Sequence, residues 1–128
     1  MSFHHTLHQQ RAAEALAGAE AEWDAGRHNN AVGRVYYYLF HLTVAVRIAR
    51  GERTDTLSGR WEHQKTWWAS DECARRQGRP ELVGEMGQVY AQRKTSDYDS
   101  YGSSRDEAEE TIKRAKALGE VLASDLPQ

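Results

Sequence analysis

The chain has 128 residues, 39% of them hydrophobic, and a formal net charge of -2. This length suits one domain, spanning 1–128 with a core from about 6 to 123, and is too short for two ordinary domains. The slightly acidic balance excludes a general electrostatic attraction to nucleic acid, so any basic site has to be local.

The sequence predicts a cytoplasmic protein without a metal site or a cofactor. The single cysteine, Cys73, excludes an intramolecular disulfide and a CxxC zinc site, which fits a reducing compartment. His4, His5 and His8 lie at a chain end that frays readily, where histidines bind metal only adventitiously. The sequence also lacks an apolar run of the length that a signal peptide or a membrane helix requires.

The spacing of the apolar residues predicts an all-α fold. Prolines occur only at Pro80 and Pro127, and no segment alternates polar and apolar residues as a strand does. We expect five helices that form an up-and-down four-helix bundle with one additional short or terminal helix. The expected helices cover about residues 6–24, 30–50, 60–76, 80–98 and 104–123, with a loop at 99–103.

Local signals mark several helix ends. Gly26, Gly51 and Gly78 follow the first three expected helices, where glycine commonly ends a helix. Caps of helix starts are expected at the capping boxes Thr6-x-x-Gln9 and Ser104-x-x-Glu107 and at Asn29 or Asn30.

Apolar residues cover well over half of the circumference of the expected helix at 30–50. Such a helix lies at the centre of a bundle or buries a second face against another subunit. The residues fall on two adjacent stripes, Val35/Leu39/Leu42/Val46 and Val32/Tyr36/Phe40/Val44/Ile48.

The segment 93–98 carries the clearest candidate site. Arg93, Asp97 and Tyr98 lie within two helical turns, and Arg93 continues an inward-facing stripe, where its charge needs a partner. One interpretation is an ordinary ion pair between Arg93 and Asp97 at a helix end. The other is a phosphate site, in which the Arg93 guanidinium binds the anion, Asp97 orients it, and Tyr98 adds a hydroxyl or a stacking face.

Other candidate residues precede this segment in the chain. Arg34 and His41 are seven positions apart on one helical stripe, and His63 opens the third expected helix. Taken alone, His41 fits a core or interface histidine and His63 a solvated one.

Aromatic residues cluster at Tyr36 to Tyr38 and at Trp67-Trp68, with Trp61 nearby. These rings either stack on bases or fill a core and a subunit contact, and packing is favoured because few lysines lie near them.

Three segments together resemble the HEPN domain (higher eukaryotes and prokaryotes nucleotide-binding), especially its small stand-alone prokaryotic members. Those members carry a helix similar to SRAYYAxFH, then a histidine, then a helix that ends in R-x-x-ADY. The corresponding segments here are 33–41, 62–65 around His63, and 93–99, and the likeness covers about residues 10 to 122.

The resemblance implies a helical bundle that pairs as a homodimer with a site in the cleft between subunits. Many relatives are metal-independent ribonucleases or toxin partners of minimal nucleotidyltransferases, and others are non-catalytic RNA- or nucleotide-binding modules. The nuclease branch carries R-x4-6-H, whereas here Tyr98 stands where an R-x4-H motif has histidine. A phenol is a poor general base at neutral pH, so the sequence favours a non-catalytic protein.

The preferred hypothesis is therefore a homodimeric RNA- or nucleotide-binding module of a prokaryotic toxin-antitoxin or defence system. Arg93, Asp97, Tyr98, Arg34 and His63 are its candidate binding residues. One alternative is a metal-independent ribonuclease in which His63 or His41 is catalytic. Another is a non-catalytic interaction protein that pairs with a nucleotidyltransferase-type partner.

Overall fold

The prediction of an all-α fold is confirmed. A computed structural model of the chain describes the backbone of residues 3–98 and 104–127 and the side chains of residues 5–94 and 104–127, and within these ranges the regular structure is helical. The elements are α1 (Phe3–Asp24), α2 (His28–Ala49), α3 (His63–Arg76), a 3-10 turn η1 (Pro80–Leu82), α4 (Glu85–Tyr98) and α5 (Arg105–Ser124).

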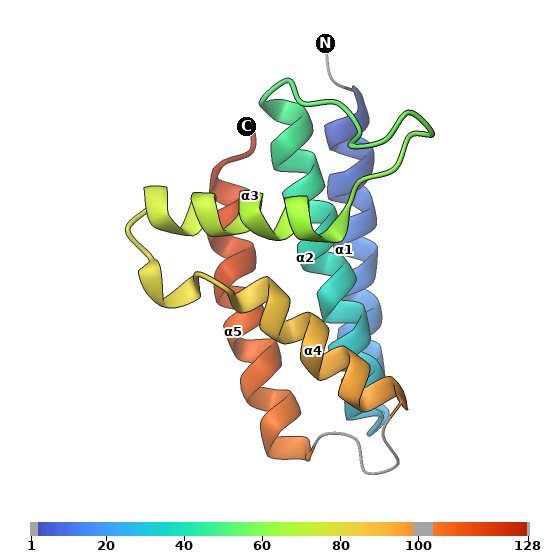
Figure 1. Ribbon diagram of the computed structural model, residues 1–128. Coiled ribbons are helices and arrows are strands. Elements are labelled where there is room, and N and C mark those ends of the chain that lie inside the picture. The colour runs from blue at the N-terminus through green and yellow to red at the C-terminus, as the bar shows by residue number, and fades with distance from the viewer. Residues whose placement is uncertain (1–2, 99–103, 128) are drawn as a thin grey trace.

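Three of the helices lie roughly parallel to one another, and two further helices cross them. Helices α1, α2 and α5 run along the long axis of the molecule, while α3 and α4 cross them obliquely (Figure 1). Helix α2 contacts all four other α-helices.

Helix α2 is the centre of this bundle. Apart from the partly buried Phe40, the residues of both apolar stripes are buried within the chain, and Tyr36, Leu39 and Val46 are fully inaccessible to solvent. The packing of one subunit thus accounts for its wide apolar surface. The side chains that surround it include Met86, Val89, Ala115, Leu118 and Leu122.

The predicted capping box of the last helix is confirmed, and the other predicted caps are wrong. The Ser104 side chain accepts from the Glu107 N–H, and the Glu107 carboxylate accepts from the Ser104 N–H. Helix α1 begins at Phe3, so Thr6 lies inside it and caps nothing. Helix α2 begins at His28, with Arg27 in the cap position and no side-chain cap.

The fourth expected helix is divided. Residues 80–82 form the 3-10 turn, and Gly84 then takes a left-handed conformation (φ 82°) that only glycine adopts easily. The Gly84 N–H donates to Asp71 Oδ1 at 2.7 Å, which ties this break to α3. Helix α4 therefore begins at Glu85 rather than at Pro80.

Helix α3 begins at His63, three residues later than expected, because a buried ion pair holds the preceding loop against α2. The Arg47 guanidinium donates to both oxygens of Asp55, at 2.9 and 2.6 Å, and lies over the Trp61 ring, 4.8 Å from its centre. Asp55 also accepts the Glu62 N–H at 2.7 Å. This network fixes the position from which α3, and with it His63, starts.

Candidate functional site

Arg93 lies on a group of tyrosine rings from two helices. Its guanidinium carbon is 5.1 Å from the centre of the Tyr37 ring and 5.9 Å from the centres of the Tyr36 and Tyr90 rings. These distances are within the range of attraction between a cation and the face of an aromatic ring. The group Tyr36, Tyr37, His63, Tyr90 and Arg93 is called the Arg93 cluster below.

The two helices bring these side chains together through their spacing. Tyr90, Arg93 and Lys94 are three and four positions apart on α4, so they share one face of that helix. The Lys94 ammonium lies over the Tyr90 ring at 4.9 Å from its centre, which adds a second cation beside the first. On α2, Tyr36 is fully buried while Tyr37 keeps 39% of its surface exposed.

His63 joins the Arg93 cluster from α3. Its Nδ1 is 2.5 Å from the Tyr36 hydroxyl, and its ring centre lies 5.6 Å from that of Tyr90 and 4.8 Å from that of Phe40. The Trp67 indole N–H donates to the same Tyr36 hydroxyl at 2.9 Å. Five residues that are far apart in the sequence therefore form one contiguous group of side chains. They are residues 36, 63, 67, 90 and 93.

The electrostatics of the cluster favour a neutral histidine beside a charged arginine. Burial lowers the pKa of His63 below its ordinary value of 6.5, and the positive charge of Arg93 lowers it further. Burial is also the main cause that raises the pKa of Tyr36 well above its ordinary value, so this phenol keeps its proton. At neutral pH the cluster thus holds a guanidinium, a neutral imidazole and a neutral phenol.

Arg34 and His41 lie on the other side of α2, against α1. The Arg34 side chain packs over Gly18 and approaches Glu22 at 3.9 Å, and about half of it is exposed. The His41 Nδ1 is 3.0 Å from the Nδ1 of His8. Burial, followed by the charge of Arg11, lowers the pKa of His41. The structure therefore brings His63 to Arg93 within one subunit and directs Arg34 and His41 toward α1.

Two further candidates and the expected loop cannot be placed in the same way. Asp97 and Tyr98 belong to the last turn of α4, but their side chains lie outside the described residues. The loop expected at 99–103 also lies outside them.

The sequence favoured packing for the tyrosines over base stacking and did not indicate that Tyr36, Tyr37 and Tyr90 surround Arg93. The i,i+3 spacing of Tyr90 and Arg93 was the available signal, because it places a ring and a cation on one helix face. Of the three tryptophans in this region, Trp61 packs on Arg47, the Trp67 indole donates to Tyr36, and Trp68 is 59% exposed.

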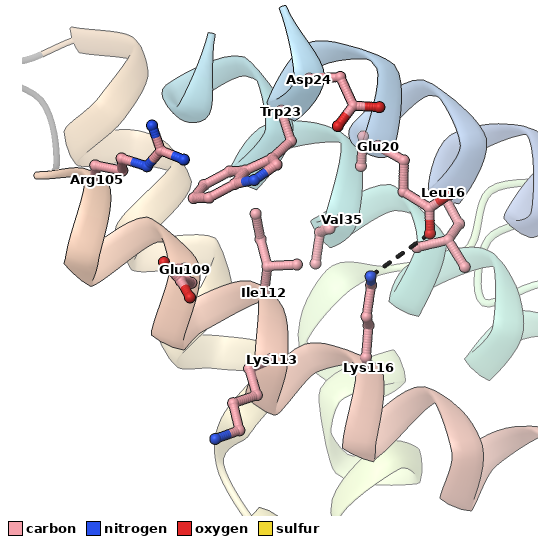
Figure 2. A pocket seen from close by; sticks show the side chains of 11 residues that line it. Leu16, Glu20, Trp23, Asp24, Val35, Arg105, Glu109, Ile112, Lys113 and Lys116 are labelled. Carbon is pink, nitrogen blue, oxygen red and sulfur yellow. Dashed lines mark ion pairs between the residues drawn. The ribbon is translucent and has the colours of Figure 1, made fainter. Parts of the chain in front are cut away.

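A separate cavity of about 550 Å³ lies between α1, α2 and α5. Trp23 projects into it beside Arg105, and Lys116 and Glu20 of its lining form an ion pair at 3.5 Å (Figure 2). Its floor is apolar, and its rim is balanced in charge, so it favours neither anions nor cations. The charged rim residues are Arg105, Lys113, Lys116, Glu20, Asp24 and Glu109.

The described part of the chain offers neither a metal site nor a membrane-spanning helix. It contains no group of three or more His, Cys, Asp or Glu side chains that could hold a metal ion. None of its helices combines the length and the apolar character needed to cross a bilayer.

The geometry defines a class of protein: an all-helical domain in which an arginine and a histidine lie on one cluster of aromatic rings. The HEPN domain family model matches residues 6–125, which is nearly the whole chain. The protein therefore belongs to the HEPN domain family, as its sequence segments predicted. A comparison with curated proteins found no match.

Proposed function

We propose that this protein is an RNA- or nucleotide-binding module of a prokaryotic toxin-antitoxin or defence system, and that it binds phosphate through Arg93. HEPN domains are associated with RNA-binding and nuclease modules in such systems. The single observation that carries the proposal is the joint placement of Arg93 and His63 on one aromatic cluster. The module acts in the cytoplasm as a homodimer.

The chemistry of the Arg93 cluster suits a phosphate ligand next to a base. A guanidinium offers a fork of N–H donors that matches phosphate oxygens, and Lys94 adds a second positive charge nearby. The exposed part of Tyr37 offers a face on which a base can stack. In the proposal Asp97 orients the guanidinium and Tyr98 contributes a hydroxyl or a stacking face. Arg34, which is about half exposed on the side of α2 that faces α1, contacts the nucleic-acid backbone outside the cluster.

A metal-independent ribonuclease is the second candidate, and it is favoured by the position of His63 beside Arg93, where burial and the arginine charge lower the pKa of the imidazole. A neutral imidazole is able to accept a proton, and a nearby guanidinium stabilises a charged phosphate. This hypothesis predicts RNA cleavage in the presence of EDTA that His63→Ala abolishes. Clean protein that leaves total RNA intact would remove it.

A third candidate, a non-catalytic protein that binds a nucleotidyltransferase-type partner, is favoured by the exposed Trp68 on α3. An exposed tryptophan is the kind of residue that anchors an interface. It predicts that Trp68→Ala weakens partner binding while RNA affinity is unchanged.

Fluorescence anisotropy with a labelled single-stranded RNA tests the preferred function. Arg93→Ala should lower the affinity about tenfold or more, since a hydrogen bond to a charged group contributes roughly 1.5–3 kcal/mol. The slope of log affinity against log salt should also fall by about one. Arg75→Ala is the matched control, because Arg75 is an exposed arginine in the last turn of α3, at the end opposite His63.

Two outcomes would contradict the proposal. Equal affinities of wild type and Arg93→Ala would show that Arg93 binds no phosphate. Equal losses in the Arg93 and Arg75 variants would show a general charge effect without a site. Sedimentation of both variants tests the homodimer, and a monomeric Arg93→Ala would assign Arg93 to the subunit contact instead.

A further inference from the structure

The Tyr36 hydroxyl has two hydrogen-bonding neighbours, and their chemistry fixes the direction of both bonds. The Trp67 indole N–H is only a donor, so at 2.9 Å the Tyr36 oxygen must accept from it. The second neighbour is the His63 Nδ1 at 2.5 Å, which is able to donate or accept depending on where the imidazole carries its proton.

Burial decides between these two arrangements. Tyr36 is fully inaccessible to solvent, so its O–H proton must find an acceptor inside the protein. If His63 donated from Nδ1, the Tyr36 oxygen would accept two hydrogen bonds and its own proton would lose that acceptor. If His63 accepts at Nδ1, the indole, the phenol and the imidazole form a chain in which each donor has an acceptor.

We propose that Tyr36 is a positioning residue, whose hydroxyl donates to the His63 Nδ1 and thereby places the proton of the neutral imidazole on Nε2. His63 packs on the cluster but keeps an exposed surface, and in this proposal its second nitrogen meets the ligand. That nitrogen then carries an N–H group and has no free lone pair.

The consequence for the site rests on the proposed function and sharpens it. Arg93 and the His63 Nε2–H are both hydrogen-bond donors, and an ionised phosphate offers only acceptors. The cluster is therefore matched to bind an RNA or nucleotide phosphate. It is poorly arranged to remove a proton from a 2'-hydroxyl, because a general base would need the opposite tautomer and would break the chain through Tyr36.

Nitrogen-15 NMR of the histidine rings tests this tautomer directly in the whole protein. In wild type at neutral pH, the His63 Nε2 should resonate as a protonated ring nitrogen and Nδ1 as an unprotonated one. Tyr36→Phe keeps the ring and removes the donor, so the signals of His63 should shift toward a mixture of both tautomers. Tyr37→Phe is the matched control, since it removes a neighbouring hydroxyl and should leave the His63 signals unchanged.

RNA affinity provides a second readout that a merely structural role would not reproduce. Tyr36→Phe should weaken RNA binding about fivefold, the effect of losing one ordinary hydrogen bond. The same substitution in a His63→Ala background should cause no further loss, because Tyr36 acts through His63. Additive losses in the double variant would overturn the positioning role.

The remaining outcomes separate this inference from the proposed function. A wild-type spectrum with the proton on Nδ1 overturns the inference, even if Tyr36→Phe fails to fold. An unchanged His63 spectrum in a folded Tyr36→Phe protein also overturns it. If wild type binds no RNA but shows the proton on Nε2, the proposed function fails while the role of Tyr36 in setting the tautomer is supported.

Discussion

Asp55→Asn removes the negative charge from the buried ion pair that anchors the start of α3. The side chains of Asp55 and Arg47 are each only 5% exposed, and two hydrogen bonds join them. The carboxylate also accepts the Glu62 N–H next to His63. Asparagine keeps the size and one acceptor oxygen but turns the other oxygen into an NH2 donor, so the substitution removes both the charge and one accepting position.

The expected cost is large for a single substitution. Removing one partner of a buried ion pair typically costs about 3–5 kcal/mol, because the other charge stays buried without compensation. Asparagine retains one acceptor, and the Glu52 carboxylate still pairs with the Arg47 guanidinium. We therefore expect Asp55→Asn to cost about 3 kcal/mol, at the low end of this range. For a chain of this size that loss lowers Tm by roughly 10 °C.

Glu52→Gln is the matched control, because Glu52 pairs with the same guanidinium at 3.0 Å from a position that is 42% exposed. Exposed ion pairs contribute about 0–1 kcal/mol, so the control should lose less than a third of what Asp55→Asn loses. Urea unfolding of the three proteins gives both free energies of unfolding. Equal losses in the two variants would refute the assignment of Arg47 and Asp55 as the anchor of α3.

The pH dependence provides an independent test. The hydrogen bond from Arg47 is the main cause that lowers the pKa of Asp55 below its ordinary value of 3.8. A lowered carboxylate pKa stabilises the folded state above the unfolded value, and this stability is lost as the pH falls through the folded value. The difference between wild type and Asp55→Asn should therefore shrink below about pH 4, and a constant difference would contradict the reasoning.

Three further predictions concern packing, reactivity and capping. A β-carbon at Gly119 would lie 2.6 Å from Tyr38 ring carbons, so Gly119→Ala should lower the free energy of unfolding in urea by about 1–3 kcal/mol. The control Gly87→Ala meets only ordinary contacts, so it should raise that free energy by up to about 1 kcal/mol. Burial raises the pKa of Cys73 to about 11, so a thiol reagent should modify it only after unfolding, and prompt reaction of the native protein would contradict this. Ser104→Ala should cost about 1 kcal/mol through the lost cap of α5, and unchanged urea unfolding would argue against that cap.

The helix ends show which features could be predicted from the sequence. The Ser104 cap was predictable because both of its hydrogen bonds join residues three positions apart. The late start of α3 was not, because it depends on contacts that Arg47 makes with Asp55 and Thr66, across a loop whose path the sequence does not specify. The break at Gly84 likewise depends on a contact with Asp71, thirteen residues earlier.

The candidate site likewise has features that the sequence predicts and features that depend on tertiary packing. The seven-residue spacing of Arg34 and His41 predicted one helical stripe, and both side chains do lie on one side of α2. Periodicity defines a stripe but does not specify which neighbour it faces, and this stripe faces α1. The contact of His63 with Tyr36, 27 residues apart, likewise depends on tertiary packing that a spacing pattern cannot predict.

An RNA titration followed by NMR is the most direct test of the account, in which Arg93 and His63 form one phosphate site. The measured signals are the Arg93 Nε–H and the ring nitrogens of His63 as a short single-stranded RNA is added to the folded protein. The account predicts that both sets shift with a single shared Kd and that the His63 shifts vanish in Arg93→Ala. Shifts with different midpoints, or His63 shifts that persist without Arg93, would contradict it.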